Sequence, residues 1–248
     1  MSTPAQRPPE ATPALERVGK VLTELVLLGL SALVGMSVVI GLMWSGVLPD
    51  VESAPWSAIL AGPLLIGTAG LSYLQLERTV LRDGDPPRPL EMPEGRERAG
   101  LGKGLLIALG TLVIASAGSM LLALAQELLF STEVAEQETI LELIRRGDPV
   151  ELSLLAVSAV VLAPLTEELL FRHMLFRRLR QRAGIMAAWT LPAVAFAVAH
   201  WNPVGLAVYV WLGSVFALAY AASGRYWVAV LVHAGHNAFA LTMLLVGF

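Results

Sequence analysis

The sequence contains no cysteine and few charged residues. The absence of cysteine excludes disulfides, thiolate metal sites and a cysteine nucleophile. Only 15% of the 248 residues are charged, against roughly 25% in soluble domains. Because 56% of the residues are hydrophobic, most of the surface must be buried in lipid.

Acidic residues are especially scarce in the second half of the chain. After Glu151 the only two are Glu167 and Glu168, which lie in the apolar run Pro164–Arg172. A charge in hydrocarbon costs several kcal/mol, so such residues usually face a cavity, have a partner and are functional. The four histidines fall in the same part of the chain: His173, His200, His233 and His236.

Several common signatures are missing. We find no signal-peptide pattern, internal repeat, heptad or nucleotide-binding glycine loop, and no HExxH zinc helix. No basic patch interleaved with aromatic residues indicates binding of nucleic acid. The expected partners are therefore membrane lipids and a membrane-associated substrate, and the sequence leaves the oligomeric state open.

The apolar runs predict an all-α, polytopic membrane helix bundle with about seven transmembrane helices. A bilayer core of about 30 Å needs roughly 20 apolar residues per helix. We expect a disordered cytoplasmic tail at 1–20, N-terminal transmembrane helices and loops at 21–149, and a catalytic core at 150–248. An amphipathic piece, Glu138–Arg145, is typical of an interfacial helix. The predicted spans are Leu25–Val47, Trp56–Leu76, Gly104–Phe130, Val150–Arg182, Ile185–His200, Pro203–Ala222 and Trp227–Val246.

Lysine and arginine are distributed unevenly over the predicted loops. Of the 17 in the chain, all but Arg145 and Arg146 fall on one side of the predicted membrane. By the positive-inside rule the N-terminus is cytoplasmic and the C-terminus external. The preference for arginine, with abundant Ala, Gly and Leu, indicates a prokaryotic source and therefore the cell (inner) membrane.

The fourth and fifth spans form a hairpin that turns near Ala183 and Gly184. Glu167 lies sixteen residues before Ala183 and His200 seventeen after it, so both are about 25 Å from the turn. His233 lies about 12 Å inside the last span, and Asn237 follows at i+4 on the same face. We therefore expect these four side chains at a similar depth, open to the cytoplasm, with His200 made level by a tilt or by unwinding at 202–205.

This set of residues indicates hydrolytic chemistry. A desolvated glutamate can act as a general base on water near neutral pH. Neutral histidines can bind Zn²⁺, orient water or stabilise an oxyanion. Glu168 and Arg172 are spaced i, i+4 and are expected to form a supporting ion pair that leaves Glu167 free. No acidic residue then remains to orient a histidine, as a Ser-His-Asp site would require.

Three motifs on three spans resemble a known family. They are Glu167-Glu168-x-x-x-Arg172, Phe196-x-x-x-His200 and His233-x-x-x-Asn237. In this order they are similar to the motifs of the CAAX-protease and bacteriocin-processing (CPBP, or Abi) family of intramembrane peptidases. The similarity covers about residues 150–245, and the first three spans are generic.

The resemblance implies an endopeptidase that cleaves a lipidated or membrane-associated protein or peptide. The family includes type II CAAX prenyl endopeptidases, and its bacterial members are linked to peptide processing and bacteriocin immunity. Glu167 would activate water with His200, while His233 and Asn237 would surround the oxyanion. The substrate, prenylated or a leader peptide, stays open. So does the choice between a metal-free glutamate mechanism and a Zn²⁺ site at His200 and His233.

Two other functions compete with the peptidase. The glutamates and histidines could form the relay of a proton- or ion-coupled transporter, although no inverted repeat and no second polar set in the first three helices supports it. A non-catalytic membrane scaffold of the same fold is the third reading. His173 and His236 are expected to be peripheral or to pack, and their roles are left open.

Overall fold

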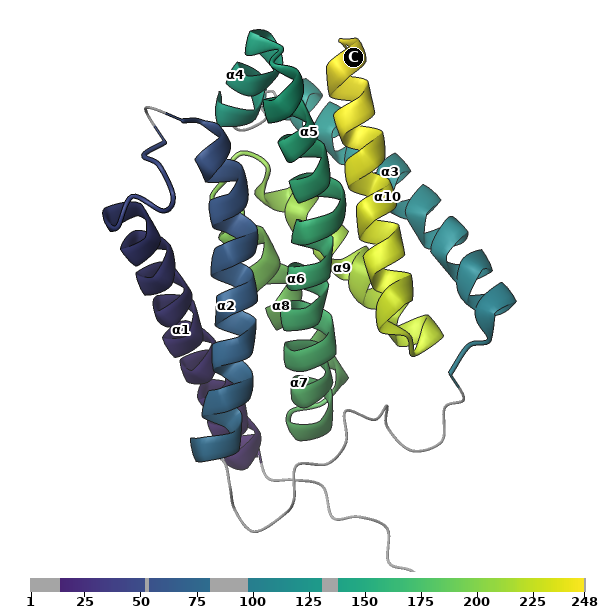
Figure 1. Cartoon of the computed structure of the whole chain (residues 1–248). Helices are drawn as coiled ribbons and strands as arrows, with labels where there is room; N and C mark the ends of the chain where they lie inside the picture. Colours follow the sequence, from purple (N-terminus) through teal and green to yellow (C-terminus); the bar gives the residue numbers. More distant parts are fainter. Residues whose placement is uncertain (1–13, 52–53, 81–97, 131–137, 248) are drawn as a thin grey trace, which may run out of the picture.

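The computed structural model describes residues 14–51, 54–80, 98–130 and 138–247, and within these ranges every regular element is helical. The predicted all-α bundle is confirmed. Figure 1 shows the helices side by side, most of them running along one common direction. Apart from the segments between 149 and 182, their bounds are α1 Ala14–Trp44, α2 Trp56–Val80, α3 Leu101–Phe130, α4 Glu138–Arg146, α8 Ile185–Ala199, α9 Leu206–Ser223 and α10 Tyr226–Val246.

The two glutamates lie on a continuous rod, Pro149–Arg182, which we call the glutamate helix. It changes between α-helical and π-helical geometry along its length. Its segments are α5 Pro149–Val157, η1 Ser158–Leu162, α6 Ala163–Glu168, η2 Leu169–Phe176 and α7 Arg177–Arg182. Short π turns inside α-helices occur frequently at functional sites. Here two of them flank the segment that ends at Glu168.

Six helices of the described residues are long and apolar enough to cross a membrane, and α8 is a shorter apolar one. With 15 residues, α8 is about 22 Å long, less than the hydrocarbon core of about 30 Å. The chain then leaves helical geometry from His200 to Gly205, where Trp201 has a φ of 49° and the Asn202 side chain accepts a hydrogen bond from the Gly205 N–H. The unwinding expected at 202–205 is therefore present.

The first helix begins earlier than predicted. We expected a tail at 1–20 and a span from Leu25, but α1 starts at Ala14. An i, i+4 ion pair between Glu16 and Lys20, at 2.6 Å, supports the additional turns in a polar stretch. The remainder of the predicted tail, 1–13, lies outside the described residues.

The packing places the glutamate helix in the middle of the bundle. The pair α1 and α2 lies on one side of it, α10 on the other, and α8 and α9 pack behind it, with α3 beyond α10 (Figure 1). Where α8 crosses α9, a Cβ on Gly213 would lie only 3.0 Å from the Ala193 Cα. Small residues allow such close approach of membrane helices, and the Gly213 carbonyl accepts a hydrogen bond from Arg172 of the glutamate helix.

A buried charge cluster joins the N-terminal helices to the glutamate helix. Glu24 of α1 is fully buried and accepts two hydrogen bonds of 3.0 Å from Arg178. Arg182 lies 3.1 Å from the same carboxylate, the Tyr73 hydroxyl of α2 donates to it, and Arg178 also pairs with Glu77. Our expectation that the first three helices carry no second polar set was wrong.

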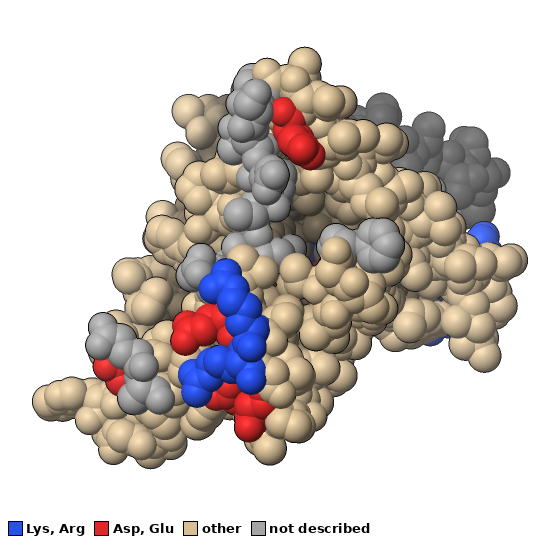
Figure 2. Space-filling view, turned by 90° about the horizontal axis from the view of Figure 1, so that it is seen from above, with Lys and Arg blue, Asp and Glu red and all other residues tan. Residues whose placement is uncertain are grey.

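The face of the molecule that carries α4 has few basic residues. Seen from above, most of the visible Lys and Arg atoms form one strip beside acidic side chains, a few others lie near the edge of the view, and most other described atoms belong to uncharged residues (Figure 2). The basic residues of α4 are Arg145 and Arg146, and Arg146 lies 3.4 Å from Glu151. The predicted amphipathic segment is thus helical, and an ion pair ties it to the start of the glutamate helix.

Candidate active site

Glu167, Glu168 and His233 lie together inside the bundle. The Nδ1 of His233 is 3.0 Å from Glu168 Oε1, and its Nε2 is 4.0 Å from Glu167 Oε2. Glu168 and His233 are almost completely buried, whereas the Glu167 side chain keeps 13% of its surface exposed. One imidazole from α10 therefore stands between two consecutive carboxylates of the glutamate helix.

Glu168 orients the imidazole, which corrects the sequence analysis. We reasoned that pairing with Arg172 would leave no acid for a histidine. A carboxylate has two oxygens and about four lone-pair sites, and Glu168 Oε1 lies near both Arg172 and His233. Because an ionised carboxylate only accepts hydrogen bonds, this contact places the ring proton on Nδ1 and turns Nε2 toward Glu167.

Arg172, one helical turn after Glu168 in the chain, holds the Glu168 carboxylate in place. The predicted i, i+4 pair is present, with Arg172 Nη1 3.1 Å from Glu168 Oε1, and Nη2 donates to the Gly213 carbonyl at 3.0 Å. The fully buried guanidinium also lies over aromatic rings, 4.6 Å from the centre of Phe196 and 5.5 Å from that of Phe216. Cation–π contacts of this kind stabilise a desolvated cation.

His200 stands at the end of α8, beside the aromatic residues of the site. Its Nδ1 lies 2.8 Å from the Phe196 carbonyl oxygen, so this nitrogen carries the proton, because a carbonyl can only accept. Its ring stacks on Tyr209 with centres 4.2 Å apart. Phe196 contacts both histidines, with ring centres 4.5 Å from His200 and 5.6 Å from His233. The first residue of the FxxxH motif thus contacts both histidine rings.

Asn237 contacts the glutamate helix at a point N-terminal to Glu167 and Glu168. Its Nδ2 donates to the Ala159 carbonyl at 2.8 Å, in the π turn η1, eight residues before Glu167. His233 and Asn237 therefore bind the same helix at two points. The His233 imidazole lies next to the glutamate carboxylates, and the Asn237 amide donates to a main-chain carbonyl.

The other two histidines make separate contacts. Nδ1 of His173 is 3.3 Å from the Tyr220 hydroxyl, and the ring lies edge-on to Tyr226. Nδ1 of His236 is 3.2 Å from Ser116 Oγ of α3. Both side chains therefore link helices, as the peripheral or packing roles expected of them would require.

Two aromatic residues of the site were not identified from the sequence. Phe216 stacks on His233, with ring centres 4.4 Å apart and planes at 21°. The Tyr226 hydroxyl donates to the Leu165 carbonyl at 2.5 Å, two residues before Glu167. Aromatic residues are common in apolar spans, so neither position carried a signal that separates it from ordinary core.

The fit of a metal ion can be judged from the donor atoms. A catalytic zinc site usually has three protein ligands, and no group of three His, Asp or Glu side chains that could hold a metal occurs in the described ranges. Nδ1 of His200 and Nδ1 of His233 contact the Phe196 carbonyl and Glu168 respectively, which is the contact that the second ring nitrogen of a metal-ligating histidine usually makes. The described residues therefore fall short of a catalytic zinc site by the number of ligands alone, and no step is assigned to a metal.

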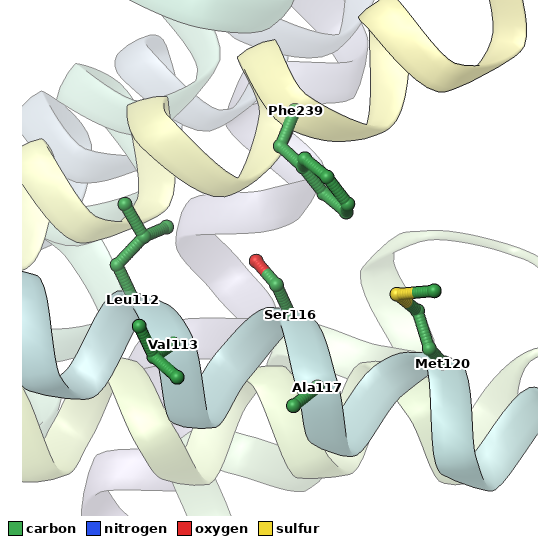
Figure 3. Close-up of a pocket in the computed structure, with 6 residues that line it drawn as sticks. All are labelled: Leu112, Val113, Ser116, Ala117, Met120 and Phe239. Atoms are coloured by element: carbon green, nitrogen blue, oxygen red, sulfur yellow. The ribbon is translucent and has the colours of Figure 1, made fainter.

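A pocket of about 290 Å³ lies between α3 and α10. Figure 3 shows Phe239 of α10 facing the side chains of α3 across it. Its lining is apolar apart from one serine, and it contains none of the predicted site residues. The lining residues are Leu112, Val113, Ser116, Ala117, Met120 and Phe239.

Comparison with known proteins identifies the region that carries this site. Residues 149–239 match the profile of the family described as type II CAAX prenyl endopeptidase Rce1-like. All three motifs, from Glu167 to Asn237, fall inside these bounds, so the suspected relationship is confirmed.

A curated relative agrees with the family. The chain is 29% identical over 92 residues to YdiL of Bacillus subtilis (strain 168), a protein named as an inferred membrane peptidase. The alignment covers 37% of this chain and 38% of YdiL, so the chain matches well under half of its relative's length. No solved structure matches. With its apolar helices and an Rce1-like region, the chain is an integral membrane protein.

Proposed function

We propose that the chain is an intramembrane endopeptidase of the CAAX type that hydrolyses a peptide bond with water activated by Glu167. The observation that carries this proposal is the pair formed by Glu167 Oε2 and His233 Nε2, which face each other at 4.0 Å. That separation is too long for a direct hydrogen bond, but one water with two hydrogen bonds of about 2.8 Å reaches both atoms.

In the proposed reaction the water donates one hydrogen to Glu167 and the other to the Nε2 lone pair of His233. Its oxygen then attacks the carbonyl carbon of the scissile bond while Glu167 takes the proton. Glu167 later returns this proton to the leaving nitrogen as the C–N bond breaks. The products are a carboxylic acid and an amine, which exchange a proton to become a carboxylate and an ammonium ion, and the glutamate is regenerated.

Glu168 and Arg172 are assigned supporting roles. Glu168 keeps the His233 proton on Nδ1, as the carboxylate of a Ser-His-Asp site does for its histidine. Arg172 holds Glu168 in place and balances its charge inside the bundle. Phe196 contacts the rings of both His200 and His233. We assign Nε2 of His200 to the substrate side, where the neutral ring accepts a hydrogen bond and the protonated ring would donate one to the scissile carbonyl.

The family indicates the substrate class. A peptide that ends in a CAAX sequence, or another membrane-associated C-terminal segment, is the expected substrate. The basic residues at the far end of the glutamate helix from α4 favour a site that opens to the cytoplasm. The small number of basic residues on the α4 face (Figure 2) supports the same orientation.

Cleavage by purified protein in liposomes tests the proposal. A fluorogenic CAAX peptide, with and without a prenyl group, is incubated with wild type and with the variants Glu167→Gln and His233→Ala. We expect cleavage by wild type and a loss of at least about 1,000-fold in kcat/KM in both variants. The matched control Glu142→Gln removes an exposed glutamate of α4 and should be fully active. Wild-type levels of cleavage by Glu167→Gln would refute the assignment.

A further inference from the structure

The π turn η1 leaves one main-chain carbonyl without a helical donor. At its end the Ala163 N–H donates to Ser158 O, five residues back, instead of to Ala159 O as in an α-helix. The next donor in π geometry would be residue 164, which is a proline and has no N–H. Ala159 O therefore lacks both of its possible backbone partners.

Asn237 supplies the missing donor. Its Nδ2 lies 2.8 Å from Ala159 O, and in a membrane a carbonyl without a partner is costly because no bulk water can replace it. The preceding residue of the same turn is also anchored, since Ser158 Oγ donates to the Ile59 carbonyl of α2 at 2.8 Å. The π turn is thus held by helices on both sides.

The direction of the glutamates depends on this turn. A π turn contains one residue more than the α-helix that would replace it, so removing it rotates all later residues by about 100°. Glu167 and Glu168 follow η1 by five and six residues. Their approach to His233 of α10 requires the extra residue to persist.

We propose that Asn237 is a positioning residue, whose amide holds the π turn that directs Glu167 and Glu168 at His233. This inference rests on the proposed function for its catalytic consequence. It differs from the role in oxyanion binding that the family resemblance implies for Asn237. In the positioning role, the loss of Asn237 acts through Ala159 and Pro164 instead of through the substrate.

A double-mutant cycle with Pro164 separates the two roles. Pro164→Ala restores a backbone N–H, so Ala159 O gains a donor from residue 164 or, if the turn relaxes to α, from Ala163. In the wild-type background we expect Asn237→Ala to lower Tm by on the order of 3 to 6 °C. In the Pro164→Ala background it should lower Tm by less than about 1 °C. The control cycle uses Pro63→Ala, a proline inside α2, and its effects should add to those of Asn237→Ala.

Kinetics give the second readout. If Asn237 is a positioning residue, Asn237→Ala should have a lower kcat with little change in KM. The pH profile of its kcat/KM should also change, because Glu167 is displaced. Loss of an oxyanion donor would instead lower kcat/KM by one factor at every pH and leave Tm unchanged. That pattern, or equal Tm losses in the two proline backgrounds, would overturn the proposal.

Hydrogen exchange keeps the test decisive if Pro164→Ala does not fold. In full-length Asn237→Ala, amides in peptides spanning 158–168 should exchange at least about tenfold faster than in wild type. Unchanged exchange in this segment would overturn the proposal. If wild type cleaves no peptide, the proposed peptidase function fails, whereas the Tm and exchange measurements still decide the role of Asn237.

Discussion

The substitution Glu24→Gln should destabilise the protein strongly although it is remote from the site. Glu24 is fully buried and has two arginines and a tyrosine as partners. Removing one member of a buried ion pair costs roughly 3–5 kcal/mol when the remaining charge stays buried and uncompensated, and the low end of this range is expected here because Arg178 keeps Glu77 as a partner. At about 2–4 °C per kcal/mol for a chain of this size, Tm should fall by about 6 to 20 °C.

The assay is thermal unfolding of the detergent-solubilised protein, followed by the loss of the monodisperse peak in size-exclusion chromatography. Glu16→Gln is the matched control, since it makes the same change on the same helix in an exposed pair with Lys20. Exposed pairs contribute about 0–1 kcal/mol, so its Tm should fall by less than about 4 °C. Equal Tm values for the two variants would refute the reasoning that the cluster joins α1 and α2 to the glutamate helix.

Three further predictions concern the site itself. Glu168→Gln should lower kcat at least about 100-fold, because the amide oxygen stays with Arg172 while the new NH₂ group donates to Nδ1 of His233 and moves the ring proton to Nε2. Steady-state kinetics with unchanged membrane expression checks this, and a loss below threefold would contradict it. Phe216→Leu should lower kcat by about 3- to 10-fold through loss of the ring stacked on His233, while Phe239→Leu, in the pocket between α3 and α10, should leave kcat unchanged. Chelators such as EDTA and phenanthroline should leave the cleavage rate within about twofold, because the described donor atoms provide no three-ligand metal site; a loss restored by Zn²⁺ would contradict the glutamate mechanism.

Much of the site follows from local spacing in the sequence. The ion pair between Glu168 and Arg172 and the shared face of His233 and Asn237 both follow from the i, i+4 geometry of a helix. The hairpin at residues 183–184 and the unwound segment after His200 follow from span lengths and from glycine and proline positions. These features depend on residues close together in the chain.

The parts that could not be predicted depend on contacts between helices. Glu168 contacts both Arg172 and His233 because α10 packs beside the glutamate helix. The spacing of residues along the chain does not predict where α10 packs. The π turn leaves no pattern in the sequence, although Pro164 signals that a carbonyl one turn earlier loses a donor. Glu24 did have a signal, since a glutamate at the start of an apolar run needs a buried partner. It was missed because the predicted span began one residue later.

A single-turnover reaction in H₂¹⁸O tests most directly whether Glu167 activates water. Enzyme in excess over peptide is mixed in ¹⁸O-labelled water, and the newly formed carboxylate is analysed by mass spectrometry. If Glu167 acts as a base, the carboxylate formed in the first turnover contains one ¹⁸O atom. An unlabelled carboxylate in the first turnover, transferred from the glutamate as a nucleophile, would contradict the account, as would undiminished cleavage by Glu167→Gln.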